Sequence, residues 1–194
     1  MNTYMKMLVF VLALAVGTSA VLLGMEELTA DRIEANAEIE LQQTILDAYG
    51  ISYNTGNINE VFASSVDVIE EDGLTLYVDT NSGAVSFEFT GGGVWGPISG
   101  VLTLESDYET IKSVTVLQQE ETPGLGGVVA NPQYLATFEG VLMTPELMIE
   151  KDTSANDPNE VDSITGATRT SDAFELILNN AYEAHQSLWQ SLEN

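Results

Sequence analysis

The sequence contains no cysteine, a single histidine and few basic residues. The absence of cysteine from all 194 residues excludes disulfides, thiolate-bound metal clusters and a thiol nucleophile. Because His185 stands alone, there is no histidine cluster for a catalytic zinc, and we expect no metal site. Only 5 Lys and Arg residues oppose 30 Asp and Glu residues, which gives a formal net charge of −25. A surface of this sign repels phosphate backbones, so we expect no nucleic acid partner.

The charges are unevenly distributed, and the first 25 residues form a distinct segment. Every acidic residue lies at or after Glu26, and residues 7–23 carry no charge. A helix rises about 1.5 Å per residue and needs roughly 20 residues to cross the hydrocarbon core. Lys6 precedes the apolar run and acidic residues follow it, which predicts a membrane helix with a cytoplasmic N-terminus. The alternative is a signal peptide cleaved near Ala20, but apolar residues continue past that position, so we favour a retained anchor.

This pattern predicts three parts. Residues 1–25 form a single-pass anchor in the cytoplasmic (inner) membrane. Residues 26–50 form a helical stalk, because apolar residues recur at three- to five-residue steps as far as Tyr49 and Gly50 then ends the helix. Residues 51–194 form a domain on the periplasmic or extracellular side. Its size and the 44% hydrophobic content of the chain suit one packed core.

The periodicity within the domain predicts an α+β fold. From Leu74 onward, apolar residues alternate with polar or small ones, which indicates strands. Asn81-Ser82-Gly83 suits a hairpin turn between the first two strands. A closing helix is expected from Asp172, because Asp172 and Glu175 resemble a capping box. We therefore expect an antiparallel sheet packed by helices, with strands at 74–78, 85–89, 98–104, 111–117 and 147–150 and the closing helix at 172–192.

Two short segments resemble binding motifs but favour other interpretations. Residues 91–96 satisfy G-x-G-x-x-G, yet an alternating run rather than a helix follows, which argues against dinucleotide binding. We interpret them as a glycine-rich turn that a planar group approaches, with Trp95 as its wall; a core tryptophan beside a loop is the alternative. Residues 152–159 partly resemble a calcium-binding loop. The glycine that such a loop has at its sixth position is missing, so we expect a solvated acidic loop.

The chemistry concentrates in two other segments, residues 121–127 and 162–168. In the second, Thr168 follows Gly166 and Ala167 just ahead of the predicted helix. Small residues let a bulky group approach the backbone, and a helix N-terminus offers unpaired N–H groups to a phosphate. Arg169, one of only 5 basic residues, lies at this point. The residues by themselves leave two interpretations open, a phosphate site and a strand–turn–helix junction.

The two segments resemble the hallmarks of the FMN-binding domain family. Residues 162–168, Asp-Ser-Ile-Thr-Gly-Ala-Thr, are similar to the motif that carries FMN through a phosphoester on its last threonine, which is Thr168 here. Residues 121–126, Glu-Thr-Pro-Gly-Leu-Gly, match the second hallmark. The resemblance implies a covalent FMN and an electron-transfer role, with no catalytic residue of the chain's own. It also implies site residues Thr165, Gly166, Ala167, Arg169 and Thr170 at the phosphate, Glu121, Thr122, Leu125, Gly126 and Trp95 along the flavin, and Asp162 in its attachment.

Within this family the sequence is similar to two kinds of membrane-complex component. One is the C subunit of the Na+-translocating NADH:quinone oxidoreductase, and the other is the G subunit of the Rnf ferredoxin:NAD oxidoreductase. We favour the first, because Gly127 stands where the Rnf-type motif has Asp. Either resemblance implies membrane subunits of an Na+- or H+-pumping complex as partners, electron transfer between a membrane iron–sulfur centre and another FMN, and a Mg-dependent flavin transferase for maturation. A stand-alone flavinylated carrier is a further alternative, and a scaffold without cofactor or a hydrolase is disfavoured.

Overall fold

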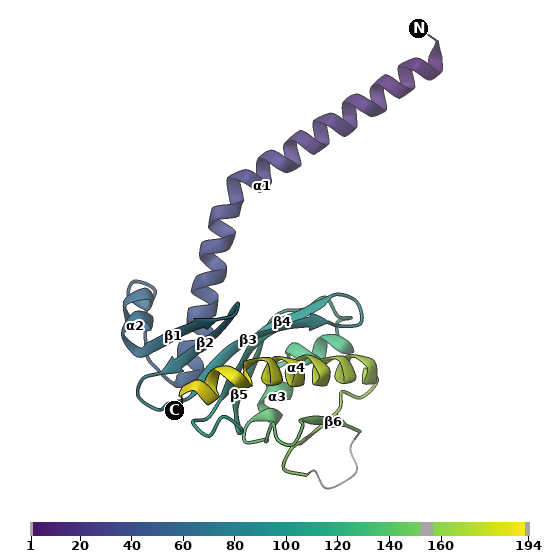
Figure 1. The fold of residues 1–194 in the computed structure, drawn as a ribbon. Helices are drawn as coiled ribbons and strands as arrows, with labels where there is room; N and C mark the ends of the chain where they lie inside the picture. Colours follow the sequence, from purple (N-terminus) through teal and green to yellow (C-terminus); the bar gives the residue numbers. More distant parts are fainter. Residues whose placement is uncertain (1, 152–156, 193–194) are drawn as a thin grey trace. The chain divides into compact units, whose positions relative to one another are not determined.

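The computed structural model describes residues 2–151 and 157–192, and the predicted acidic loop lies largely outside this range. The chain divides into two compact units, residues 1–40 and residues 41–194. Figure 1 draws the elements. Their order is α1 (Thr3–Tyr49), α2 (Ile58–Ser65), β1 (Val66–Glu71), β2 (Leu74–Asp79), β3 (Val85–Gly92), β4 (Pro97–Leu104), β5 (Ile111–Gln118), η1 (Gly126–Ala130), α3 (Pro132–Leu135), η2 (Ala136–Phe138), β6 (Met148–Glu150), β7 (Glu160–Asp162) and α4 (Thr168–Leu192).

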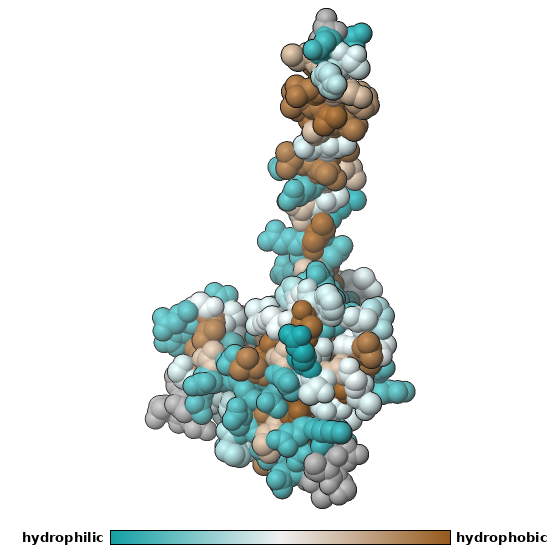
Figure 2. Space-filling model, turned by 90° about the vertical axis from the view of Figure 1, so that its right-hand side faces the viewer, coloured by the Kyte–Doolittle hydropathy of each residue, from teal (hydrophilic) through white to brown (hydrophobic). Residues whose placement is uncertain are grey.

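The first unit consists of the N-terminal part of α1. Among the described residues, α1 is the one helix long and apolar enough to cross a membrane, and no residue of its apolar stretch is buried. Large side chains such as Phe10 and Leu22 are 67% and 70% exposed. Hydrophobic side chains gather on this part of the helix in Figure 2. Because exposing this much apolar surface to water is unfavourable, the unit suits a lipid environment.

The second unit contains a five-stranded antiparallel sheet in the order β1-β2-β3-β4-β5. Helix α4 packs against the sheet, mainly over β3, as Figure 1 shows. The last turns of α1 also belong to this unit, since Ile45 and Leu46 are fully buried and the Tyr49 hydroxyl donates to the Tyr77 carbonyl at 2.7 Å. The predicted α+β class, with a long apolar helix and an antiparallel sheet packed by helices, is confirmed.

The core lies between the sheet and α4. Phe174 of α4 is fully buried and meets Phe89 and Phe138 edge to face, with ring centroids 5.8 Å apart in both pairs. His185 of the same helix stacks on Phe87 at 4.4 Å. Burial lowers the pKa of His185 because it disfavours the charged ring. The histidine is therefore a packing residue.

The structure corrects the predicted start of the last helix. Helix α4 begins at Thr168 rather than at Asp172, because the N–H groups of Thr170 and Ser171 already donate to the Ala167 carbonyl at 3.0 Å. The predicted capping box does not form, since the Glu175 carboxylate accepts the N–H of Ile149 instead. Sequence analysis also missed α2, β1, α3 and β7, which are at most eight residues long and so offer too few apolar positions to establish a period.

The charge balance of the folded chain leads to a prediction about salt. Lys112 pairs with Glu105 at 3.4 Å, but 5 basic residues cannot neutralise 30 acidic ones, and the chain keeps a net charge of −25. The surplus carboxylates therefore repel one another. Raising NaCl from about 0.1 to about 1 M shortens the Debye length from roughly 10 to roughly 3 Å, so we expect the melting temperature of the full chain in nonionic detergent to rise by several degrees. KCl at equal ionic strength serves as the control for screening, and a flat response to both salts contradicts the prediction.

Candidate functional site

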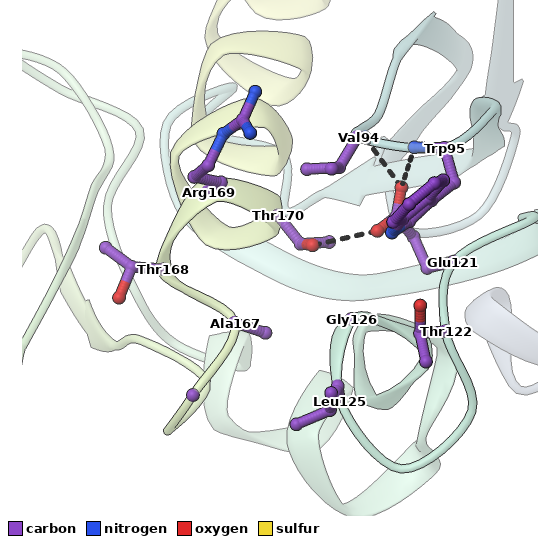
Figure 3. A pocket seen from close by; sticks show the side chains of 11 residues that line it. Val94, Trp95, Glu121, Thr122, Leu125, Gly126, Ala167, Thr168, Arg169 and Thr170 are labelled. Atoms are coloured by element: carbon purple, nitrogen blue, oxygen red, sulfur yellow. Dashed lines mark hydrogen bonds between the residues drawn. The ribbon is translucent and has the colours of Figure 1, made fainter.

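A cavity of about 370 Å³ lies where three segments of the second unit meet. This volume falls within the roughly 300–1,000 Å³ typical of ligand pockets. The segments are the turn between β3 and β4, the loop that follows β5 and the first turn of α4, and Figure 3 shows their side chains around the opening. The lining residues are Val94, Trp95, Glu121, Thr122, Leu125, Gly126, Gly166, Ala167, Thr168, Arg169 and Thr170.

The turn between β3 and β4 supplies the wall at Trp95. The two strands pair in antiparallel register as far as Gly92 and Pro97, and the Gly93 N–H donates to the Gly96 carbonyl at 2.9 Å to close the turn. A strand rather than a helix follows the glycine run, so the dinucleotide motif is excluded. The Trp95 side chain is 73% exposed, and the alternative of a core tryptophan is therefore wrong.

The loop after β5 supplies a buried carboxylate. Glu121 is 4% exposed. One of its oxygens, Oε1, accepts the N–H groups of Val94 and Trp95 at 2.7 and 3.0 Å, and the other, Oε2, accepts the Thr170 hydroxyl at 2.8 Å. Figure 3 shows these bonds. All of its partners are donors, which suits the ionised carboxylate. Thr122 and Leu125 of the same loop are exposed at the cavity rim.

The first turn of α4 supplies positive potential and a hydroxyl. The N–H groups of Thr168 and Arg169 precede the first helical hydrogen bond, so they point out of the N-terminus as donors for an anion. Arg169 is exposed, and no ion pair of its guanidinium occurs within the described part of the chain. Gly166, with a φ of +83°, makes the turn into the helix. The turn thus combines features that bind phosphate.

The hydroxyl groups near this turn differ in accessibility. Thr168 is exposed at the edge of the cavity and, in Figure 3, lies on the far side of the turn from Glu121. Thr170 is 4% exposed and donates to Glu121, and Ser171 is fully buried and donates to the Ala167 carbonyl at 3.3 Å. Thr168 is therefore the accessible hydroxyl of the cavity's helical wall.

Ten of the twelve residues named from the sequence line this cavity. The other two, Asp162 and Thr165, line a separate cavity of about 540 Å³ beside Tyr134. Burial raises the pKa of Tyr134 well above its ordinary value.

Sequence reasoning missed Val94 as a lining residue, since its position in the turn depends on the Glu121 hydrogen bond. That bond joins residues 27 positions apart, and no local pattern indicates it.

The comparisons with known proteins agree with the two motifs. Residues 93–183 match the family model of the FMN-binding domain. The C subunit of the Na+-translocating NADH-quinone reductase of Pasteurella multocida is 36% identical over 104 residues, which cover 51% of this chain and 38% of that protein. The corresponding protein of Vibrio anguillarum is 24% identical over 88% of this chain and 87% of its own length. The matching segment thus spans well under half of the Pasteurella relative. The resemblance to the FMN-binding domain family is confirmed.

A solved structure shares the fold. The crystal structure of Shewanella oneidensis NqrC superposes with a TM-score of 0.70 over 79% of this chain and 96% of that protein, at 22% sequence identity. At this identity the likeness establishes the fold.

Proposed function

We propose that this chain, which resembles the FMN-binding domain family and the C subunit of the Na+-translocating NADH-quinone reductase, is a membrane-anchored electron-transfer protein that carries FMN covalently on Thr168. One observation carries the proposal: residues of both motifs, about 40 positions apart in the sequence, line a single cavity with an exposed hydroxyl at a helix N-terminus. The protein would serve as a subunit of a membrane complex, an Na+- or H+-pumping NADH:quinone oxidoreductase.

The residues of the cavity fit the proposed cofactor. A phosphate at the first turn of α4 would accept hydrogen bonds from the Thr168 and Arg169 N–H groups and lie near the Arg169 guanidinium. Gly166 leaves room for the phosphate to approach the backbone of the turn, because its Cα carries no side chain. Trp95 and Leu125, which are 73% and 48% exposed at the rim, would offer apolar faces to a ring system. Bound FMN would supply reversible electron transfer, with the protein relaying electrons between a membrane iron–sulfur centre and another FMN subunit.

The accessibility of the hydroxyls supports Thr168 as the attachment residue. A transferase must reach the oxygen that it modifies, which disfavours the buried Thr170 and Ser171. Thr165 is exposed but lines the other cavity. In the proposed reaction the Thr168 Oγ attacks the flavin-side phosphorus of a flavin dinucleotide bound with Mg²⁺ to the transferase. The new O–P ester bond replaces the pyrophosphate bond, a nucleoside monophosphate leaves, and the hydroxyl proton passes to a base; Asp162 would assist from the surface near the turn.

The membrane side follows from the charge of the N-terminal segment. Lys6 precedes the apolar part of α1 and acidic residues follow it, so we propose a cytoplasmic N-terminus and a periplasmic or extracellular domain. The apolar stretch of α1 contains no ionisable residue, and an ion path across the membrane therefore needs the partner subunits. An equivalent G subunit of an Rnf complex or a stand-alone flavinylated carrier shares this arrangement, and the proteins that copurify with the chain distinguish the three.

Covalent attachment predicts a simple outcome on a denaturing gel. Co-expression of the full chain with a Mg-dependent flavin transferase should give a flavin-fluorescent band near 20.9 kDa, and expression without the transferase should give a dark band. The phosphoester survives denaturation, whereas a bound but unattached flavin is lost. A dark band in both lanes, with the transferase active on a known substrate domain, refutes the covalent flavin.

A further inference from the structure

Glu121 is the buried carboxylate at the centre of the candidate site. Its side chain is 4% exposed, and both of its oxygens are already occupied by donors of the protein. A carboxylate in this state has little capacity left to bind a flavin directly. Its burial calls for a different explanation, because an ionised group is removed from water only at a cost that its partners must offset.

The hydrogen bonds of Glu121 join the three segments that form the cavity. Oε1 accepts two successive N–H groups of the β3–β4 turn, from Val94 and Trp95, and Oε2 accepts the hydroxyl of Thr170 in α4. Successive N–H groups aimed at one anion form a strong and directional contact. Within the described residues no ring contact of Trp95 with another aromatic side chain occurs. The backbone bonds to Glu121 therefore fix the main chain from which the exposed Trp95 side chain projects.

Two glycines leave the space that the carboxylate fills. A Cβ on Gly93 would lie 2.5 Å from Oε1 of Glu121. A Cβ on Gly126 would lie 2.5 Å from Oε2 and 2.6 Å from the Thr170 hydroxyl oxygen. Any side chain at either position would push the carboxylate out of reach of its donors. Gly93 and Gly126 thus both leave space for the Glu121 carboxylate to reach its hydrogen-bond donors.

We propose that Glu121 is a positioning residue, which ties the β3–β4 turn to the first turn of α4 and holds Trp95 as a wall of the cavity before any flavin is attached. This role replaces the direct flavin contact that the family resemblance implies for Glu121. The inference deepens the proposed function and rests on it, in that the wall is useful only if a flavin occupies the cavity. The contact itself can be tested on the flavin-free chain.

The first test measures hydrogen exchange of the Val94 and Trp95 amides in the full chain, in detergent and without transferase. Glu121→Gln keeps the shape but offers a weaker, neutral acceptor, so exchange of these amides should accelerate about tenfold, with a larger effect in Glu121→Ala. Glu120→Gln, at the exposed neighbouring position, is the matched control and should leave exchange unchanged. Amides of β3 and β4 such as Phe87 and Leu102 report whether each variant is folded. Exchange within about twofold of the parent in folded Glu121→Gln overturns the proposal, whether or not Glu121→Ala folds.

The second test measures flavin fluorescence of the native, transferase-treated chain. If Trp95 is held against the flavin, Trp95→Leu should raise the fluorescence per attached flavin by removing a quenching ring. Glu121→Gln should raise it in the same direction, with each signal normalised to the covalent flavin in that variant. Brightening in Trp95→Leu alone overturns the positioning role and leaves the flavin site standing. A parent chain that carries no flavin instead refutes the proposed function, and the exchange experiment then decides the role of Glu121 by itself.

Discussion

Replacing Thr168 with valine is expected to abolish covalent flavin attachment, lowering the fluorescence of the denatured band by at least about 100-fold. The change exchanges the hydroxyl for a methyl group of similar size, so no phosphoester can form. Thr168 is exposed at the first position of α4, where a substitution with no buried partner costs little stability. The measurement is in-gel flavin fluorescence after co-expression with the transferase, normalised to the protein in each band.

Two matched substitutions control this experiment. Thr165→Val removes an exposed hydroxyl three residues earlier, beside the other cavity, and should leave labelling near the parent level. Thr170→Val removes the buried hydroxyl that donates to Glu121, so labelling should persist, with a lower yield at most. Flavin that remains on Thr168→Val and disappears from Thr165→Val or Thr170→Val would move the attachment site to that residue.

The largest effect on stability is expected at Phe174. This ring is fully buried and contacts both Phe89 of the sheet and Phe138 of η2. Phe174→Ala removes the contact between α4 and these two elements and leaves a cavity, which typically costs about 3–5 kcal/mol. Because α4 also forms one wall of the candidate site, cavity formation there should weaken flavin labelling as well. Chemical denaturation of the full chain in detergent, followed by Trp fluorescence, measures the free energy of unfolding.

Leu176 provides the control on the same helix. It lies two residues further along α4 and is 61% exposed, so Leu176→Ala should change the free energy of unfolding by less than about 0.5 kcal/mol. Alanine has a higher helix propensity than either residue, so equal losses in the two variants would contradict the assignment of the Phe174 effect to packing between α4 and the sheet.

Local patterns were sufficient for much of the fold. The alternation in residues 74–78, 85–89, 98–104 and 111–117 predicts β2 to β5. In β3, for example, Phe87 and Phe89 are buried whereas Glu88 between them is exposed. The uncharged run at residues 7–23 predicts the apolar part of α1 for a similarly local reason. Secondary-structure prediction failed for segments without such a period. Strand β1 lies at the sheet edge with mostly exposed residues, so its sequence carries little apolar signal.

The start of α4 shows how tertiary contacts override a local signal. Asp172 and Glu175 have the spacing of a capping box, but Glu175 is drawn to the N–H of Ile149 in β6. The helix instead begins at Thr168, where Gly166 turns the chain. This displacement of one turn matters chemically, because it puts Thr168 itself at the positive end of the helix.

Neighbouring residues alone predicted the family resemblance, the long apolar helix and most of the residues that line the candidate cavity, since motifs and periodicities are local properties of a chain. Which of those residues share a cavity depended on the folded arrangement. Folding brings Glu121 within hydrogen-bond distance of Trp95 and Thr170, 26 and 49 positions away, and it places Asp162 and Thr165 beside a different cavity. Burial and hydrogen-bond partners are set by how distant segments pack, and for this reason the motif could name Glu121 but could not reveal that both of its oxygens are taken up by the protein itself.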